Sequence, residues 1–158
     1  MLILLINGIV SETPNEIDNY YKKYDVEFSE SIELEEKLNF VMKIIKSVYN
    51  YFNGNISCLK NKNYFFTFYS TLVNQIYGIK DCNFSRNSFL SREAISNNFN
   101  LLYRLCSDFL SDYNKNIEEY CNRNINSNWT KFRENHSKRT TNKLERYNRI
   151  EFMNKFFK

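Results

Sequence analysis

Glycine and proline are almost absent from this 158-residue chain, which contains only Gly8, Gly54, Gly78 and Pro14. Tight turns between β-strands depend on these residue types, because glycine tolerates positive φ angles and proline presets a turn conformation. A sheet fold needs many such turns, so the composition favours helices. The length fits one domain with a substantial core. We therefore expect residues 1–158 to form a single all-α domain, a bundle of about five to seven helices.

Two segments place apolar residues at the spacing of an amphipathic helix. The first runs from Ser31 to Gly54, and the second runs from Ser91 to Asn114 and would be extended by residues 117–122. In both, the apolar positions alternate between steps of four and three, which is typical of a helix with one face on a core. In the first segment these positions are Leu34, Leu38, Val41, Ile45, Val48 and Phe52.

Residues 63–77 differ from these segments, because apolar side chains occupy nearly every face before the run stops at Gly78. Such a run is typical of a central, buried helix. A β-strand is the alternative, because the segment is rich in aromatic and β-branched residues.

Shorter helices complete the predicted bundle. The sequence Thr13-Pro14-Asn15-Glu16 combines a capping residue, a proline suited to the first helical position and a glutamate that can complete a capping box, so a helix should run to about Tyr24. The opening residues 1–6 are too few for a membrane span and lack the positive charge of a signal peptide, so we interpret them as the last turns of a core helix. An Asn-rich loop at 122–128 should precede a short helix at 129–135 and a last helix at about 141–157.

Charge is divided between the two ends of the chain. Residues 1–36 contain nine acidic and two basic residues, a net of −7, whereas residues 123–158 contain ten basic and three acidic residues, a net of +7. The overall net charge of +4 therefore conceals an acidic N-terminal third and a basic C-terminal segment. The basic segment could meet a polyanion, an acidic protein partner or the acidic third of its own chain.

The basic segment supplies the candidate site for a nucleic acid or protein partner. It combines long cations with hydroxyl groups at a helix start, which are the parts of a phosphate contact. On the last helix, basic residues share one strip with apolar residues that should pack in the core. Three interpretations stay open, namely internal pairing with the acidic helix that starts near Glu30, contact with phosphates, and contact with an acidic protein. The candidates are Arg133, Lys138, Arg139, Thr140, Thr141, Lys143, Arg146 and Arg149.

Motifs for catalysis, metal binding or cofactor binding do not stand out in the sequence. His136, the one histidine, could act as a general base, but a solvent-facing loop histidine is the simpler interpretation. The four cysteines are 24, 24 and 15 residues apart, a spacing that matches no zinc motif, so we expect reduced core thiols in a cytoplasmic protein. Trp129 could stack on a base or a guanidinium, or serve as a core anchor. We predict no catalytic residue, no metal and no cofactor.

Four segments resemble the helical region that follows the ParB-like domain in the GmrSD family of restriction endonucleases. They are Leu2–Ile9, Ile17–Asp25, Lys62–Ser70 and Arg139–Asn142, the last followed by Arg146 and Arg149. In that family the nucleotide-hydrolysing and nuclease chemistry belongs to the N-terminal domain, with glycine-rich and D-G-x-Q-R-type motifs, or to a fused HNH domain. This sequence contains none of these motifs. The resemblance therefore implies a helical accessory region of a defence protein without the catalytic domain.

Together these features predict a non-enzymatic helical module that binds a macromolecule and has no membrane segment. It would act on a nucleic-acid-targeting bacterial defence system, either as a regulatory subunit or as a phage-borne inhibitor of a host nuclease, such as an anti-CRISPR or anti-restriction protein. One alternative is an accessory domain of a GmrSD-type system that binds DNA or RNA directly. A second alternative is a degenerate nuclease centred on His136.

Overall fold

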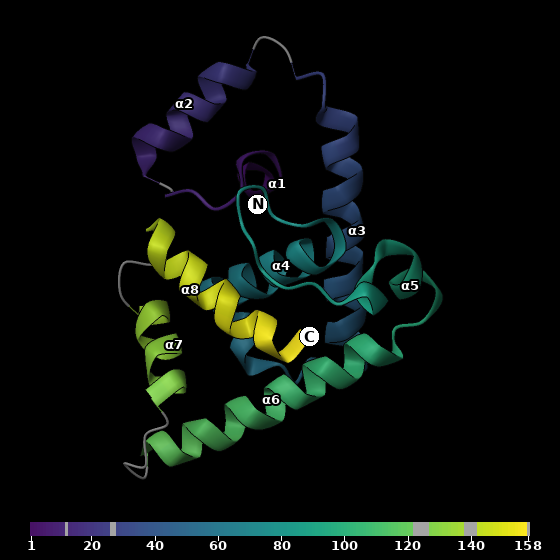
Figure 1. Cartoon of the computed structure of the whole chain (residues 1–158), viewed down its shortest axis with the longest axis vertical. Helices are drawn as coiled ribbons and strands as arrows, with labels where there is room; N and C mark the ends of the chain where they lie inside the picture. Colours follow the sequence, from purple (N-terminus) through teal and green to yellow (C-terminus); the bar gives the residue numbers. More distant parts are fainter. Residues whose placement is uncertain (12, 26–27, 122–126, 138–141, 158) are drawn as a thin grey trace.

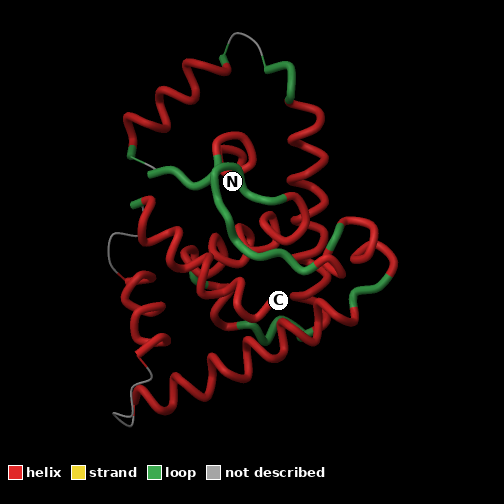
Figure 2. The backbone as a smooth tube through the Cα atoms, in the orientation of Figure 1, coloured by secondary structure: helices red, strands yellow, loops and turns green. Residues whose placement is uncertain are grey.

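The described residues fold into helices joined by loops, with no strand among them (Figures 1 and 2). The computed structural model describes residues 1–158 except 12, 26–27, 122–126, 138–141 and 158. The all-α prediction is confirmed. The described α-helices are α1 (Leu2–Asn7), α2 (Pro14–Tyr24), α3 (Ser31–Tyr51), α4 (Lys62–Tyr77), α5 (Arg92–Asn97), α6 (Asn100–Cys121), α7 (Ser127–Ser137) and α8 (Lys143–Asn154), with short 3-10 helices η1 (Ser57–Lys60), η2 (Ser88–Leu90) and η3 (Lys155–Phe157).

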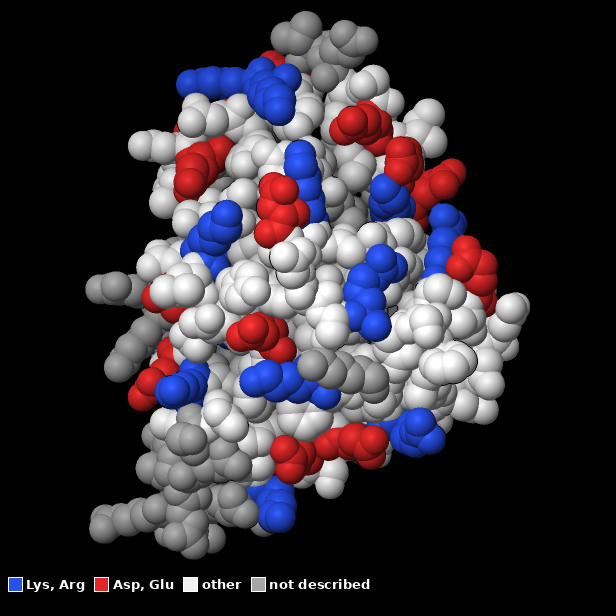
Figure 3. All heavy atoms as spheres, in the orientation of Figure 1, with Lys and Arg blue, Asp and Glu red and all other residues white. Residues whose placement is uncertain are grey.

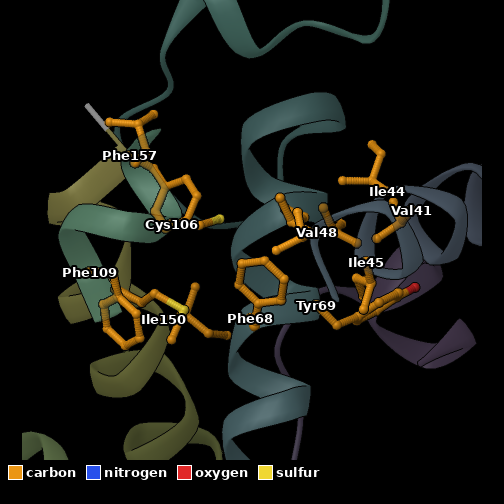
Figure 4. Close-up of a cluster of buried hydrophobic side chains, with 14 of the residues drawn as sticks. Val41, Ile44, Ile45, Val48, Phe68, Tyr69, Cys106, Phe109, Ile150 and Phe157 are labelled. Carbon is orange, nitrogen blue, oxygen red and sulfur yellow. The ribbon is translucent and has the colours of Figure 1, made fainter. Parts of the chain in front are cut away.

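Helix α4 lies at the centre of the core, and eleven of its sixteen residues are buried. Figure 4 shows α3 on one side of α4, while α6 and α8 lie on the other. A helix that is apolar on all sides needs neighbours on all sides. The prediction of a central buried helix at 63–77 is thus confirmed. The core residues labelled around Phe68 and Tyr69 of α4 are Val41, Ile44, Ile45, Val48, Cys106, Phe109, Ile150 and Phe157.

Two buried amides of α4 bind the loop that follows this helix. The side-chain nitrogens of Asn74 and Gln75 each lie 3.2 Å from the carbonyl oxygen of Ser85, to which they donate. Both also donate to Oδ1 of Asn154, at 3.2 Å and 2.7 Å. Oε1 of Gln75 accepts from the backbone N–H of Asn87 at 2.7 Å. These bonds satisfy groups that would be costly to bury unpaired, and they join α4, α8 and the loop between α4 and η2 (Figure 2).

The N-terminal helices begin and end as their sequences predict. At the start of α2, the hydroxyl of Thr13 accepts from the N–H of Glu16, and the carboxylate of Glu16 accepts from the N–H of Thr13. This is the predicted capping box. Gly8, which follows α1, has a φ of +72°, and a Cβ there would lie 2.4 Å from the carbonyl oxygen of Lys80. Only glycine allows α1 to end this close to the loop after α4.

The predicted helix from Ser91 to Asn114 is wrong as a single element, because the chain breaks at Asn98. Asn98 has an extended backbone (φ −155°, ψ 115°), and its side-chain oxygen accepts from the N–H of Asn100 at 2.8 Å. This bond caps the start of α6, which then extends to Cys121 as expected. The Asn-rich loop falls mainly on residues 122–126, which lie outside the described residues.

Candidate partner-binding site

Among the eight predicted site residues, the four that the structure describes do not share one exposed surface. Lys143 is exposed at the start of α8, Arg133 is half-buried on α7, and Arg146 and Arg149 are buried. The side chains of Arg146 and Arg149 therefore lie inside the fold, and not on the exposed surface that the sequence predicts for these candidates. The other four candidates lie outside the described residues, namely Lys138, Arg139, Thr140 and Thr141.

Arg146 holds the segment that connects α1 to α2. Its guanidinium carbon lies 4.3 Å from the centroid of the Phe66 ring, a cation–π contact with α4. Its Nη1 donates to the carbonyl oxygen of Val10 at 3.3 Å. One turn earlier, the N–H of Lys143 donates to the hydroxyl of Ser11 at 3.2 Å. The start of α8 thus fixes the backbone from which α2 departs.

Arg149 joins α8 to α7 instead of facing a partner. The side chain is 1% exposed, and its Nη1 donates to the carbonyl oxygen of Asn135 near the end of α7. Burial lowers the pKa of Arg149 to about 10, with a contribution from the neighbouring guanidinium of Arg146. Arg149 therefore stays charged at neutral pH inside the fold. Sequence periodicity placed Ile150, Met153 and Phe157 correctly in the core, where each is fully buried.

His136 is a buried helical residue, which corrects the prediction of a solvent-facing loop histidine. Its ring stacks on Tyr64 with a centroid distance of 3.8 Å. Nδ1 lies 2.7 Å from the carbonyl oxygen of Phe132, and Nε2 lies 3.2 Å from the hydroxyl of Thr67. A carbonyl only accepts, so Nδ1 carries the proton. Burial, together with the charge of Arg149, lowers the pKa of His136 to about 3, so the ring is neutral at physiological pH.

The acidic start of α3 and the start of α8 lie on opposite sides of the molecule (Figure 1). The ion pair observed in the acidic third, between Glu33 and Lys37, lies within α3. In Figure 3, described acidic and basic side chains are interspersed over the visible face. The structure thus gives no support, among its described residues, to internal pairing between α3 and α8.

An apolar groove of about 550 Å³ lies between α1 and α2, and none of the predicted basic site residues lines it. Helix α2 has no buried residue, although four of its apolar side chains follow the spacing i, i+3, i+4, i+7. This spacing is the sequence signal that could have revealed the groove, because the apolar face of an amphipathic helix normally packs against another surface. The groove residues on α2 are Ile17, Tyr20, Tyr21 and Tyr24, and those on α1 are Leu2, Ile3 and Ile6.

Each wall of this groove includes an exposed apolar side chain. Tyr21 is 75% exposed and Leu2 is 40% exposed. A contact from the Asn7 amide to the Tyr20 hydroxyl, at 3.0 Å, joins the two helices. Asp25 lies at the edge of the groove, within a third of the chain that has a net charge of −7. The groove therefore combines an apolar floor with an acidic surrounding sequence.

The chain matches no family model, no curated protein and no solved structure. Its function is therefore inferred from its geometry. No helix in the described part of the chain is long and apolar enough to cross a bilayer.

Other sequence candidates for chemistry have structural roles. Trp129 is a core anchor, 4% exposed, and its indole N–H donates to the carboxylate of Asp112 at 3.0 Å. Cys58 and Cys106 are buried free thiols, and burial raises the pKa of both. Within the described residues, no cluster of His, Cys, Asp and Glu has the geometry of a metal site.

We expect Arg146→Ala to lower the free energy of unfolding by about 1–3 kcal/mol, because it leaves the Val10 carbonyl without this donor and removes the contact with Phe66. Lys143→Ala is the matched control on the same helix and should change stability by less than about 0.5 kcal/mol. Urea denaturation followed by circular dichroism measures both. Equal stability of Arg146→Ala and the parent protein would contradict the structural role of Arg146.

Stability should also depend on pH through His136. The unfolded chain takes up a proton at the ordinary pKa of about 6.5, whereas the folded chain does so only near pH 3. Lowering the pH from 7 to 5 should therefore destabilise the fold by about 2 kcal/mol, and raising it should restore the loss. Denaturation at these two pH values tests this, with His136→Gln expected to remove the dependence. An unfolding free energy that does not change in the parent protein would contradict a buried, neutral histidine.

Proposed function

We propose that this chain is a protein-binding module that docks on a partner through the groove between α1 and α2. The observation that carries the proposal is the apolar face of α2, none of whose residues is buried, opposite the exposed Leu2 of α1. Exposed apolar patches of this kind mark interaction sites in soluble proteins. Pockets for small molecules enclose most of their ligand. This groove is open, and apolar side chains along its walls are exposed to solvent. A helix from a partner protein would fill the groove and bury these side chains as well.

The charge of the N-terminal third supports a partner with a basic surface. Residues 1–36 have a net charge of −7, and such a segment steers association with positively charged proteins. Proteins that bind nucleic acid carry basic grooves, since their affinity rests on contacts to phosphates. The resemblance to the GmrSD accessory region points to the same class. The proposed partner is thus a nuclease or other effector of a nucleic-acid-targeting defence system, which the module regulates or inhibits.

Direct binding of DNA or RNA is a weaker alternative. It would depend on the C-terminal cations, but Arg146 and Arg149 are engaged within the fold, which leaves Lys143 as the exposed candidate among the described residues. A degenerate nuclease centred on His136 has less support, because a buried neutral ring that contacts Phe132 and Thr67 is not placed to reach a phosphodiester.

The test replaces one anchor of the groove. Tyr21→Asp places a charge on the apolar face of α2 and should weaken binding of the partner roughly tenfold or more, as expected for an aromatic anchor. Phe89→Asp is the matched control, because Phe89 is 73% exposed and Tyr21 is 75% exposed. The partner is first recovered from a bacterial lysate with the parent protein and then purified, and isothermal titration gives the affinities.

Two outcomes of this experiment would contradict the proposal. If Tyr21→Asp and Phe89→Asp bind the purified partner equally well, the groove is not the docking site. If the parent protein recovers no nuclease or defence component at low salt, the proposed class of partner is wrong.

A further inference from the structure

A second groove, of about 280 Å³, lies along the second half of α3, beside η1 and the start of α4. Met42, Ile45 and Tyr49 line it from α3, and Leu59 and Phe65 line it from η1 and α4. Ile45 also belongs to the core, with Val41, Ile44 and Val48, whereas Met42 is half-buried and Tyr49 is exposed. Met42 and Tyr49 therefore extend the apolar surface of α3 beyond the face that packs in the core.

The groove has a basic edge with no acidic residue near it in the sequence. Lys46 and Lys60 line the groove from opposite sides, on α3 and η1, and both are exposed. Two more exposed lysines, Lys43 and Lys62, lie within three residues of them along the chain. Between Glu36 and Asp81 the sequence contains six lysines and no aspartate or glutamate. Residues 42–65, the stretch of chain that lines this groove, thus include no carboxylate to offset the charge of its lysines.

The size and lining of the groove indicate the kind of occupant. Pockets for small molecules usually have volumes of roughly 300–1,000 Å³, so this open groove suits one or two side chains of a longer segment. Single-stranded nucleic acids bind on aromatic platforms, often with arginine. Here the floor is mainly aliphatic and sulfur-containing, and the cations are lysines. An apolar floor with lysines on both sides matches a peptide that alternates apolar and acidic faces.

We propose that this groove binds an acidic amphipathic segment of a protein, with apolar side chains against Met42, Leu59 and Phe65 and carboxylates beside Lys46 and Lys60. This site does not rest on the groove between α1 and α2. The two grooves share no lining residue. The molecule then offers two docking grooves with surroundings of opposite charge, and one partner or two could occupy them.

The test uses a labelled, designed helical peptide of about fifteen residues with leucine at i, i+3, i+4 and i+7 and glutamate elsewhere. Fluorescence anisotropy with the full chain should show binding that weakens with salt. The double variant Lys46→Glu/Lys60→Glu should lower the affinity roughly tenfold or more. Lys22→Glu/Lys23→Glu is the matched control, because it changes the net charge equally on two exposed lysines of α2 and should have little effect.

Two altered peptides distinguish a specific site from general attraction between charges or between apolar surfaces. A peptide with lysine in place of glutamate, and one with serine in place of leucine, should both bind at least roughly tenfold more weakly. The proposal is overturned if the acidic peptide does not bind, if both double variants lose affinity equally, or if the serine peptide binds as well as the leucine peptide. Binding of oligothymidine with the same dependence on Lys46 and Lys60, but no binding of the peptide, would assign the groove to nucleic acid instead. These results are independent of Tyr21→Asp, which tests the groove between α1 and α2.

Discussion

The burial of α4 on nearly every side is the constraint on which the rest of the structure depends. Its apolar residues require α3, α6 and α8 around it, and its polar residues require specific partners. Asn74 and Gln75 bind the loop after α4 and Asn154 of α8. Thr67 lies beside the His136 ring, which links α4 to α7. The elements that surround α4 are thereby positioned by hydrogen bonds as well as by packing.

Two of the basic C-terminal residues, Arg146 and Arg149, stabilise this arrangement from within the fold. Arg146 lies over Phe66 of α4 and binds the Val10 carbonyl, and Arg149 binds a carbonyl at the end of α7. Arginine suits such positions because its planar guanidinium stacks on rings and donates several hydrogen bonds. The burial of these arginines moves the candidate binding surface away from the C-terminal segment. We therefore propose the groove beside α2, in the acidic third of the chain, as the docking site in place of the basic strip.

Much of the fold could be predicted from the sequence, whereas the site could not. Helical spacing located α3 and the core face of α8, since burial of apolar residues sets that spacing, and a run that is apolar on nearly every face located α4. Spacing does not show which basic side chain donates to a carbonyl that is distant in the sequence. The Arg146–Val10 hydrogen bond, for example, spans 136 residues. Nor does it reveal that Asn98 would interrupt a helix with its own side chain. The apolar stripe of α2 was visible in the sequence, but only the structure shows that nothing among the described residues buries it.

Hydrogen exchange of the full chain tests the central claim most directly, which is that α2 is an uncovered arm attached to a body built around α4. Amides of α4 should exchange most slowly, at rates that report global unfolding. Amides of α2 should exchange much faster, because none of its residues is buried, and they should become protected when the partner binds. Protection of α2 equal to that of α4 in the isolated protein would contradict the account, because it would show that the apolar face of α2 is already covered.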